Sequence, residues 1–290
     1  MTQAPAVTVI VTTYNWPEAL SMVLESLRLQ SSGDFEIVIA DDGSRQETRD
    51  VIDRFREKSG LTVKHFWQED KGYRPSRSRN GAADLAEGKY LVFIDGDCCL
   101  FPDFVTSHQE LAEEGWFVAG RRCYIRQSMT GHIFRKSLQI YRWPKTLWFL
   151  LALTARSNRP FQFLRLPFSD QKRKRRPEAW EKVQTCNLGV WRKDFIAADG
   201  FDISYHGHGL EDSDFVLRLI RSGVHRKDGD HTSPVLHLFH SRRDSTTPDG
   251  VHPNALRFDA LVESDRHLPV SGYADTVANR EQAGGSAQQA

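Results

Sequence analysis

The sequence lacks both of the glycine-rich loops that commonly hold phosphate groups in α/β proteins. No GxGxxG follows its first apolar run, and no GxxxxGK[ST] occurs in its 290 residues. These absences exclude the usual dinucleotide-binding fingerprint and the P-loop. If the chain binds a nucleotide, a metal ion and basic side chains must hold the phosphates instead.

Cysteine is scarce, and long hydrophobic segments are missing. The four cysteines form no CxxC pair and no other zinc spacing. Cys98 and Cys99 are adjacent and are poor disulfide partners, so we expect free thiols in a reducing compartment. The apolar segment 147–155 is far shorter than the ~20 residues of a membrane-spanning helix. With no secretory pattern at the start, we predict a cytoplasmic protein, able to lie at the inner face of the cell membrane.

The formal net charge of +1 hides an uneven distribution of charge. Between Arg135 and Arg176 there are twelve Lys or Arg residues and one acid, Asp170, together with many Trp, Phe and Leu residues. This mixture favours a surface segment that contacts anionic membrane lipids. It also fits an insertion that packs its aromatic residues on the main domain. Nucleic-acid binding is a third and less favoured interpretation.

Strand and helix patterns alternate from residue 7 to residue 95. Short β-branched or apolar runs are separated by segments with helical spacing of apolar residues, which predicts a parallel sheet covered on both faces. We expect the tail from residue 271 to be disordered because it is rich in Ala, Gly and Gln. The predicted strands are 7–13, 35–40, 61–67, 90–95, 116–119, 185–191 and 234–239, and the predicted helices are 17–30, 46–58, 75–86, 102–114 and one starting near Glu211.

Acidic or hydroxyl residues follow three of these strands. Asp95-Gly96-Asp97 ends the run 90–94, Asp41-Asp42 follows the second strand, and Thr12-Thr13 closes the first. Because ligands of open α/β sheets bind at the carboxyl ends of the strands, these residues predict one polar crevice. Carboxylates that close together suit Mg²⁺ or Mn²⁺. The ordinary alternative is an acidic turn in which Gly96 has a positive φ.

A second group of polar residues lies downstream. The glycine-rich segment 206–212 ends in Glu211-Asp212, where a helix begins, and His237 and His240 follow the next strand. For either acid alone, capping of the helix N-terminus is the simpler explanation.

Five motifs at this order and spacing resemble the family 2 glycosyltransferases with the GT-A fold. The resemblance covers residues 7–97 and 186–261. The C-terminal part also looks like the β-1,4-galactosyltransferase and chondroitin-polymerase branch, in residues 207–214, His240-Ser241-Arg242 and Arg257-Phe258-Asp259. It implies an α/β GT-A fold, with a mostly parallel Rossmann-like central sheet, helices on both faces and a basic, aromatic helical insertion. The motifs are Thr12-Thr13-Tyr14-Asn15, Asp41-Asp42-Gly43-Ser44, Arg79-Asn80-Gly81, Asp95-Gly96-Asp97 and Glu211-Asp212.

The resemblance also implies a division of the chain and of the donor site. Residues 1–125 would bind the nucleotide sugar, 126–182 would form the insertion, 183–270 would bind the acceptor and catalyse transfer, and 271–290 would be the disordered tail. The donor would be a nucleotide sugar, with a UDP-sugar expected. Its uracil and ribose would contact Asp42 and Asp70 beside the turn Thr13-Tyr14, with Arg79 near the nucleotide and Asp95 near the ribose and the metal shell.

For the metal, Mn²⁺ or Mg²⁺, the resemblance implies Asp97 and His240 as protein ligands. His237 is the alternative to His240, because a strand would place the two side chains on opposite faces. A cation bridging the phosphates would stabilise the leaving nucleoside diphosphate.

Asp212 would be the general base, with Glu211 orienting the acceptor or raising the pKa of the base. One base and no nucleophile imply a single displacement with inversion. The acceptor, a glycan or a lipid-linked glycan, would contact His206 and His208, where the galactosyltransferase branch has tryptophan. The alternatives from other classes are a nucleotidyltransferase and a non-catalytic basic module that binds membrane or nucleic acid.

Overall fold

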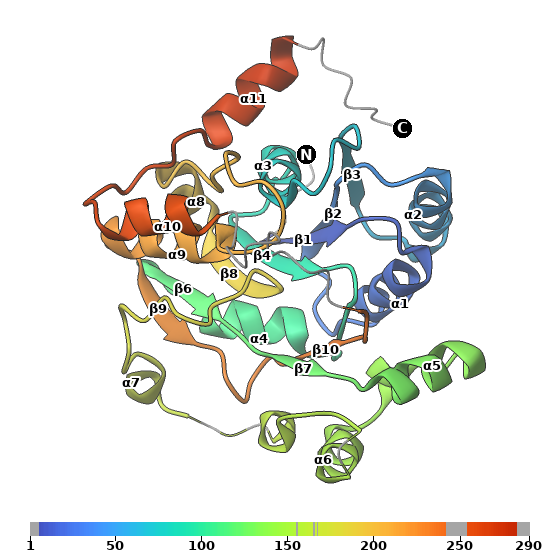
Figure 1. Ribbon diagram of the computed structural model, residues 1–290. Helices are drawn as coiled ribbons and strands as arrows, with labels where there is room; N and C mark the ends of the chain where they lie inside the picture. Colours follow the sequence, from blue (N-terminus) through green and yellow to red (C-terminus); the bar gives the residue numbers. More distant parts are fainter. Residues whose placement is uncertain (1–5, 155, 165, 167, 242–253, 283–290) are drawn as a thin grey trace.

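The computed structural model describes residues 6–154, 156–164, 166, 168–241 and 254–282. Its centre is a seven-stranded sheet in the order β3-β2-β1-β4-β8-β6-β9 (Figure 1). Only β8 is antiparallel to its neighbours, so the predicted mostly parallel sheet is confirmed. The strands are β1 (Val7–Thr13), β2 (Phe35–Asp41), β3 (Val63–Trp67), β4 (Tyr90–Asp95), β6 (Trp116–Ala119), β8 (Asn187–Trp191) and β9 (His225–Asp228).

Helices cover both faces of this sheet because alternate side chains of its strands enter two separate cores. Val9 and Val11 of β1 pack in one core, whereas Ile10 between them packs in the other. The first core is covered by α1 (Pro17–Arg28), α2 (Gln46–Ser59) and α4 (Phe104–Leu111). The second is covered by α3 (Pro75–Asp84), α8 (Arg192–Ala197) and α9 (Glu211–Arg221), with α10 (Ala255–Val262) packed against α9.

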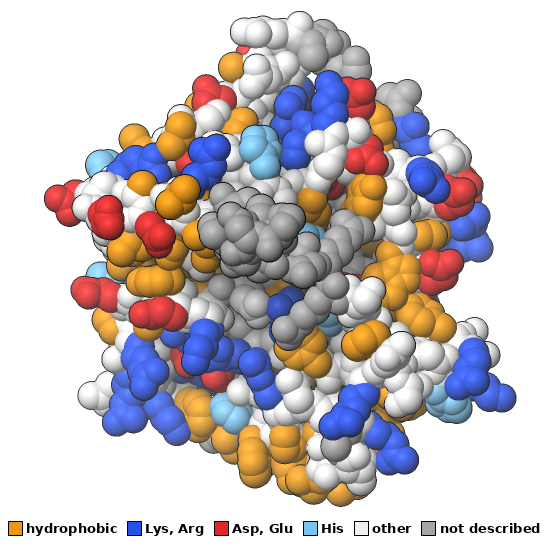
Figure 2. Space-filling model, viewed as in Figure 1, with side chains coloured by type: hydrophobic (Ala, Val, Ile, Leu, Met, Phe, Trp, Pro, Cys, Tyr) orange, Lys and Arg blue, Asp and Glu red, His pale blue; other side chains and the backbone are white. Residues whose placement is uncertain are grey.

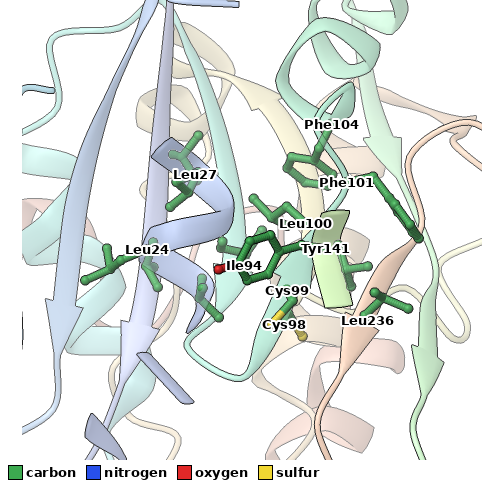
Figure 3. Packing of buried hydrophobic residues seen from close by; sticks show 14 of the residues in the cluster. Leu24, Leu27, Ile94, Cys98, Cys99, Leu100, Phe101, Phe104, Tyr141 and Leu236 are labelled. Atoms are coloured by element: carbon green, nitrogen blue, oxygen red, sulfur yellow. The ribbon is translucent and has the colours of Figure 1, made fainter. Parts of the chain in front are cut away.

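A small second sheet, which the sequence did not predict, extends the first core. β10 (Val235–His237) lies between β5 (Cys98–Leu100) and β7 (Arg122–Tyr124). It places His237 opposite Cys98, which is the residue directly after Asp97. Figure 3 shows Tyr141 packed over Cys99 and Leu100 of β5. All four cysteines are buried free thiols, as predicted.

The basic segment forms short helices along one edge of the molecule (Figure 1). Its aromatic residues anchor it: Trp148 is fully buried, stacks on Phe163 at 5.9 Å and donates its indole N–H to the carbonyl of Ile140 at 3.2 Å. Among the described residues, no helix is long and apolar enough to cross a membrane. The elements are α5 (Gln127–Lys136), η1 (Ile140–Arg142), α6 (Lys145–Leu153), η2 (Pro160–Phe163) and α7 (Asp170–Arg173).

The predicted strands and helices are all present, with ends that differ by at most three residues. The prediction of a disordered tail from residue 271 is wrong for α11 (Tyr273–Gln282). This helix has few apolar residues, so its own sequence does not predict it, but it packs on α3. Tyr273 and Arg280 both bond to the Asp84 carboxylate. Residues 283–290 of that prediction lie outside the described residues.

Candidate active site

A cavity of about 1320 Å³ opens where β1, β2 and β4 end and the small sheet begins. Predicted residues from three separate motifs line it together with predicted histidines, as expected for strands that end at one edge of a sheet. The predicted residues in its lining are Thr13, Tyr14, Asp42, Asp95, Asp97, His208, His237 and His240. Asp70, Arg79, His206, Glu211 and Asp212 are not part of that lining.

Asp42 is held rigidly at the end of β2. Its carboxylate accepts hydrogen bonds from the Gln68 amide and, at 2.6 Å, from the backbone N–H of Arg74. Burial raises the pKa of Asp42, and these two donors partly offset that effect. The rigid carboxylate therefore presents a fixed acceptor at the cavity wall.

Asp70 reaches the same region through a loop that touches the turn after Asp42. Gly43 has φ +96°, and a Cβ there would lie 2.6 Å from the Asp70 backbone, so only glycine fits both the conformation and the contact. Asp70 is exposed and accepts a hydrogen bond from the Tyr14 hydroxyl at 2.8 Å. The structure thus places Tyr14, Asp42 and Asp70 on adjacent loops.

Asp97 and two histidines form a cluster with the composition of a metal site. Nε2 of His240 lies 3.4 Å and Nε2 of His237 lies 3.6 Å from the same carboxylate oxygen of Asp97. The three ligand atoms lie within 4.8 Å of one another. Burial lowers the pKa of His237 and so favours the neutral imidazole that binds metals, whereas burial raises the pKa of Asp97 and so disfavours the ionised carboxylate. A divalent cation beside Asp97 would supply the positive charge that stabilises this carboxylate.

The structure corrects the prediction that His237 and His240 lie on opposite faces of a strand. β10 ends at His237, so His240 is beyond the strand and its ring turns toward Asp97 as well. The ring centroids are 5.1 Å apart. Strand alternation therefore does not place them on opposite faces, and the geometry admits both as ligands.

Gly96 brings the two aspartates of the turn close to β1. Its N–H donates to the carbonyl of Thr12 at 2.7 Å, and an added Cβ would lie 3.0 Å from that oxygen. Its φ is not positive, so the conformation assumed for an ordinary acidic turn is absent at this residue. Asp95 and Asp97 also form a second cluster of possible ligands with Cys98.

A buried ion cluster lies on the other side of Asp95. The guanidinium of Arg79, only 3% exposed, lies 3.7 Å from Asp95, 3.4 Å from Glu211 and 3.3 Å from Asp212. Arg79 was predicted to lie near the nucleotide, but its charge is directed to three carboxylates. It therefore connects the turn after β4 to the start of α9.

Asp212 is oriented by a residue that sequence reasoning did not identify. Thr185 donates to it twice, from the hydroxyl at 2.7 Å and from the backbone N–H at 3.1 Å. In the sequence, Thr185 only begins a predicted strand, and no motif marks it. The helix-capping alternative is not supported, because Leu210 occupies the N-cap position and no side chain of the described residues caps the helix.

Glu211 is buried and incompletely paired. One carboxylate oxygen bonds to Arg79, and the other has no hydrogen-bond partner in the described chain. Burial and the adjacent Asp212 raise the pKa of Glu211 to about 7. Glu211 therefore changes its protonation near neutral pH.

The two predicted acceptor histidines differ in their surroundings. His208 stacks on Tyr73 with ring centroids 3.7 Å apart, and both residues line the cavity. His206 is exposed. Tyr73 was not identified from the sequence, although its pairing with His208 forms a flat aromatic surface where the resembling branch has tryptophan.

Glu211→Gln is expected to change how stability depends on pH. The pKa of Glu211 is raised in the folded state from 4.5 to about 7, so the native state holds this proton more tightly. Its contribution to stability is complete below about pH 4.5 and is lost as pH rises through about 7. Glutamine stays neutral, so the variant should gain stability relative to the wild type between pH 5 and 8, by roughly 1–3 kcal/mol.

Urea unfolding at a series of pH values, with chelator present, measures this difference. Glu263→Gln, at an exposed glutamate after α10, is the matched control and should follow the wild type. Parallel stability curves for Glu211→Gln and the wild type would contradict the raised pKa.

The sequence matches two family descriptions. Glycosyl transferase family 2 matches over residues 8–189, and the N-terminal domain of galactosyltransferase matches over residues 168–241. Among curated relatives, validoxylamine A glucosyltransferase from Streptomyces hygroscopicus subsp. jinggangensis is 32% identical over 232 residues, which cover 76% of this chain and 52% of that protein. Chondroitin synthase from Escherichia coli is 31% identical over 123 residues, 41% of this chain and 18% of that protein. The chain thus spans about half the length of the first relative.

Solved structures share the fold. A mannosyltransferase from Pyrobaculum calidifontis in complex with GDP-Man and Mn²⁺ has a TM-score of 0.56 at 19% identity, covering 98% of this chain and 77% of that one. Residues 1–349 of S. aureus TarS in complex with UDP-GlcNAc have a TM-score of 0.54 at 16% identity, covering 82% and 59%. These neighbours are GT-A glycosyltransferases, which confirms the predicted fold. Because the family match spans more than half of its 290 residues, this chain belongs to glycosyl transferase family 2.

Proposed function

We propose that this protein is a metal-dependent, inverting glycosyltransferase that moves a sugar from a UDP-sugar to a hydroxyl group of a glycan or lipid-linked acceptor. One observation supports this most directly. The possible metal ligands Asp97, His237 and His240 lie on one side of Asp95. Asp212 lies on the other side, where Arg79 contacts both Asp95 and Asp212. The family favours this activity over nucleotidyl transfer and over non-catalytic binding of membrane or nucleic acid.

For the donor, we place the uracil and ribose beside Asp42, Asp70 and the turn Thr13-Tyr14. The fixed acceptor oxygens of Asp42 suit the N–H edge of a base, and the Tyr14–Asp70 hydrogen bond brings a second polar pair to the same turn. TarS was solved with UDP-GlcNAc, whereas the Pyrobaculum enzyme was solved with GDP-Man. The choice of UDP therefore rests on the resemblance and on the TarS complex.

For the metal, Asp97, His237 and His240 would hold the ion, with Asp95 close by. When bound, the cation would stabilise the negative charge on the leaving diphosphate. Two imidazole nitrogens beside one carboxylate suit Mg²⁺ poorly, because it prefers all-oxygen shells of strict geometry. We therefore expect Mn²⁺ to support more activity than Mg²⁺.

For the chemistry, Asp212 would accept the proton of the attacking hydroxyl. Its two hydrogen bonds from Thr185 fix the orientation of the carboxylate, and Arg79 places a positive charge beside it. Glu211 is the second acid beside Arg79. Asp95 pairs with the same guanidinium and lies next to the proposed metal ligands. With a base and no protein nucleophile, displacement would occur once and invert the anomeric configuration.

For the acceptor, the stacked pair Tyr73 and His208 would form the contact surface, with His206 nearby in the same loop. A Campylobacter jejuni relative, 28% identical over 123 residues, is named for transfer to an undecaprenol-linked glycan, and the Streptomyces relative is named for validoxylamine A. A hydroxyl group of a glycan or of a lipid-linked glycan is therefore the proposed acceptor.

A release assay over common UDP- and GDP-sugars, with Mn²⁺ or Mg²⁺, tests the proposal. One UDP-sugar with Mn²⁺ should give slow hydrolysis without acceptor, and chelation should stop it. Release of pyrophosphate from a nucleoside triphosphate, or GDP release exceeding UDP release, would contradict the assignment. Analysis of the product anomer then tests inversion.

A further inference from the structure

The helix α6 has an apolar face that the rest of the described chain leaves uncovered. Trp148 and Ala152 on one face are buried, whereas Leu147, Leu150 and Leu153 on the other are 36%, 57% and 58% exposed. Next to them, Phe161 of η2 is 61% exposed, with its ring centroid 6.2 Å from that of Phe149. These four residues, Leu147, Leu150, Leu153 and Phe161, form an apolar patch.

Positive charge surrounds the apolar patch. Figure 2 shows hydrophobic side chains at the lower edge of the molecule with Lys and Arg on both sides. Exposed cations come from the end of α5, from the segments on either side of α6, and from α7 and the residues after it. They are Arg135, Lys136, Arg142, Arg156, Arg159, Lys172, Arg175 and Arg176.

Negative charge is scarce within the basic segment itself. Asp170 is the only acid between residues 135 and 176, and its carboxylate is already bonded to Lys174 and Lys227, each at 2.6 Å. Lys174 and Lys227 also both pair with Glu113. The exposed cations nearby are therefore available to an external anionic partner.

We propose that this surface binds an anionic lipid bilayer, with the apolar patch at the boundary of headgroups and acyl chains and the flanking cations on lipid phosphates. An apolar strip bordered by Lys and Arg is the arrangement expected of an interfacial helix. A protein partner for the same patch would be expected to meet acids as well as cations, and residues 135–176 carry twelve Lys or Arg and a single acid. The charge distribution therefore favours a bilayer over a protein as the occupant.

The same insertion also reaches the cavity. Ile125, Arg126 and Gln127, where α5 begins, line it together with Ser157 and Asn158, which follow α6. Binding of the patch to a bilayer would therefore orient the cavity relative to the membrane surface. This link to a lipid-linked acceptor rests on the proposed function, whereas lipid binding itself does not.

Cosedimentation of the whole chain with vesicles tests the proposal. Wild-type protein should bind vesicles of phosphatidylglycerol and phosphatidylcholine, and binding should fall with added salt because the headgroup attraction is screened. The combined variant Leu150→Ser, Leu153→Ser and Phe161→Ser should reduce binding at least about tenfold, as should Lys172→Gln with Arg175→Gln and Arg176→Gln. Arg173 and Lys174 are left unchanged because their side chains already bond within the fold.

Two controls separate the outcomes. Leu256→Ser removes a leucine that is still more exposed, 77% exposed on α10, and should bind vesicles like the wild type. Thermal unfolding shows whether each variant folds, and nucleotide release without acceptor reports the proposed activity separately. Equal binding by wild type and the apolar variant would overturn the proposal. So would wild-type self-association through the patch without vesicle binding.

Discussion

Asp212→Asn is expected to lower the rate of glycosyl transfer by about 10²- to 10⁴-fold, the usual contribution of a general base. The amide has nearly the same shape as the carboxylate, and its oxygen can still accept one hydrogen bond from Thr185. Its nitrogen cannot accept the proton of the acceptor hydroxyl. The loss should therefore appear in kcat, with little change in the affinity for the nucleotide sugar.

Initial rates at saturating donor and acceptor measure the loss, and calorimetry with UDP measures donor binding. Asp50→Asn, at an exposed carboxylate of α2, is the matched control and should keep wild-type rates. Full activity of Asp212→Asn would remove Asp212 as the base and would direct attention to Glu211, which adjoins it on the same ion cluster.

Asp97→Ala is expected to remove both metal binding and transfer. Asp97 is the acid shared by the two histidines, so its loss leaves two imidazoles without the carboxylate between them. A metal ion contributes several kcal/mol to stabilisation of the departing charge, and each 1.36 kcal/mol is tenfold in rate. The transfer rate should fall by about 10²-fold or more.

Titration with Mn²⁺, followed by calorimetry, measures the binding directly and does not depend on activity. His237→Ala and His240→Ala should each weaken Mn²⁺ binding, since both rings approach the same oxygen. Asp103→Ala, which removes a carboxylate that pairs with Lys145 outside the cluster, is the control. Wild-type Mn²⁺ affinity in Asp97→Ala would disprove the assigned site.

The apolar and β-branched runs were sufficient to predict the sheet because burial on both faces leaves few alternatives for such strands. Val7–Thr13, Phe35–Asp41 and Tyr90–Asp95 form as expected, and they bring Thr13, Asp42 and Asp95 to one edge. The tail was mispredicted because its own sequence is not apolar enough to indicate a helix. Helix α11 depends instead on contacts with Asp84 and Phe195, which lie far away in the sequence.

The sequence also did not predict which side chains of the site contact one another. Thr185 and Asp212 are 27 residues apart, and Arg79 meets Glu211 across 132 residues. Tyr73 and His208 likewise come from separate loops. No local pattern encodes such pairs, because they depend on how the loops at the ends of the strands pack.

The sequence by itself determined the order of the polar residues along the chain: hydroxyl residues at the end of β1, acids at the ends of β2 and β4, a later Glu-Asp pair and downstream histidines. These features follow from local composition and from the spacing of apolar residues, and both can be seen within each segment alone. Only the tertiary structure decided that His237 and His240 face the same oxygen, because β10 ends between them. It also decided that Arg79 lies among carboxylates and that Leu147, Leu150 and Leu153 of α6 point outward, since both depend on which surfaces the rest of the fold covers.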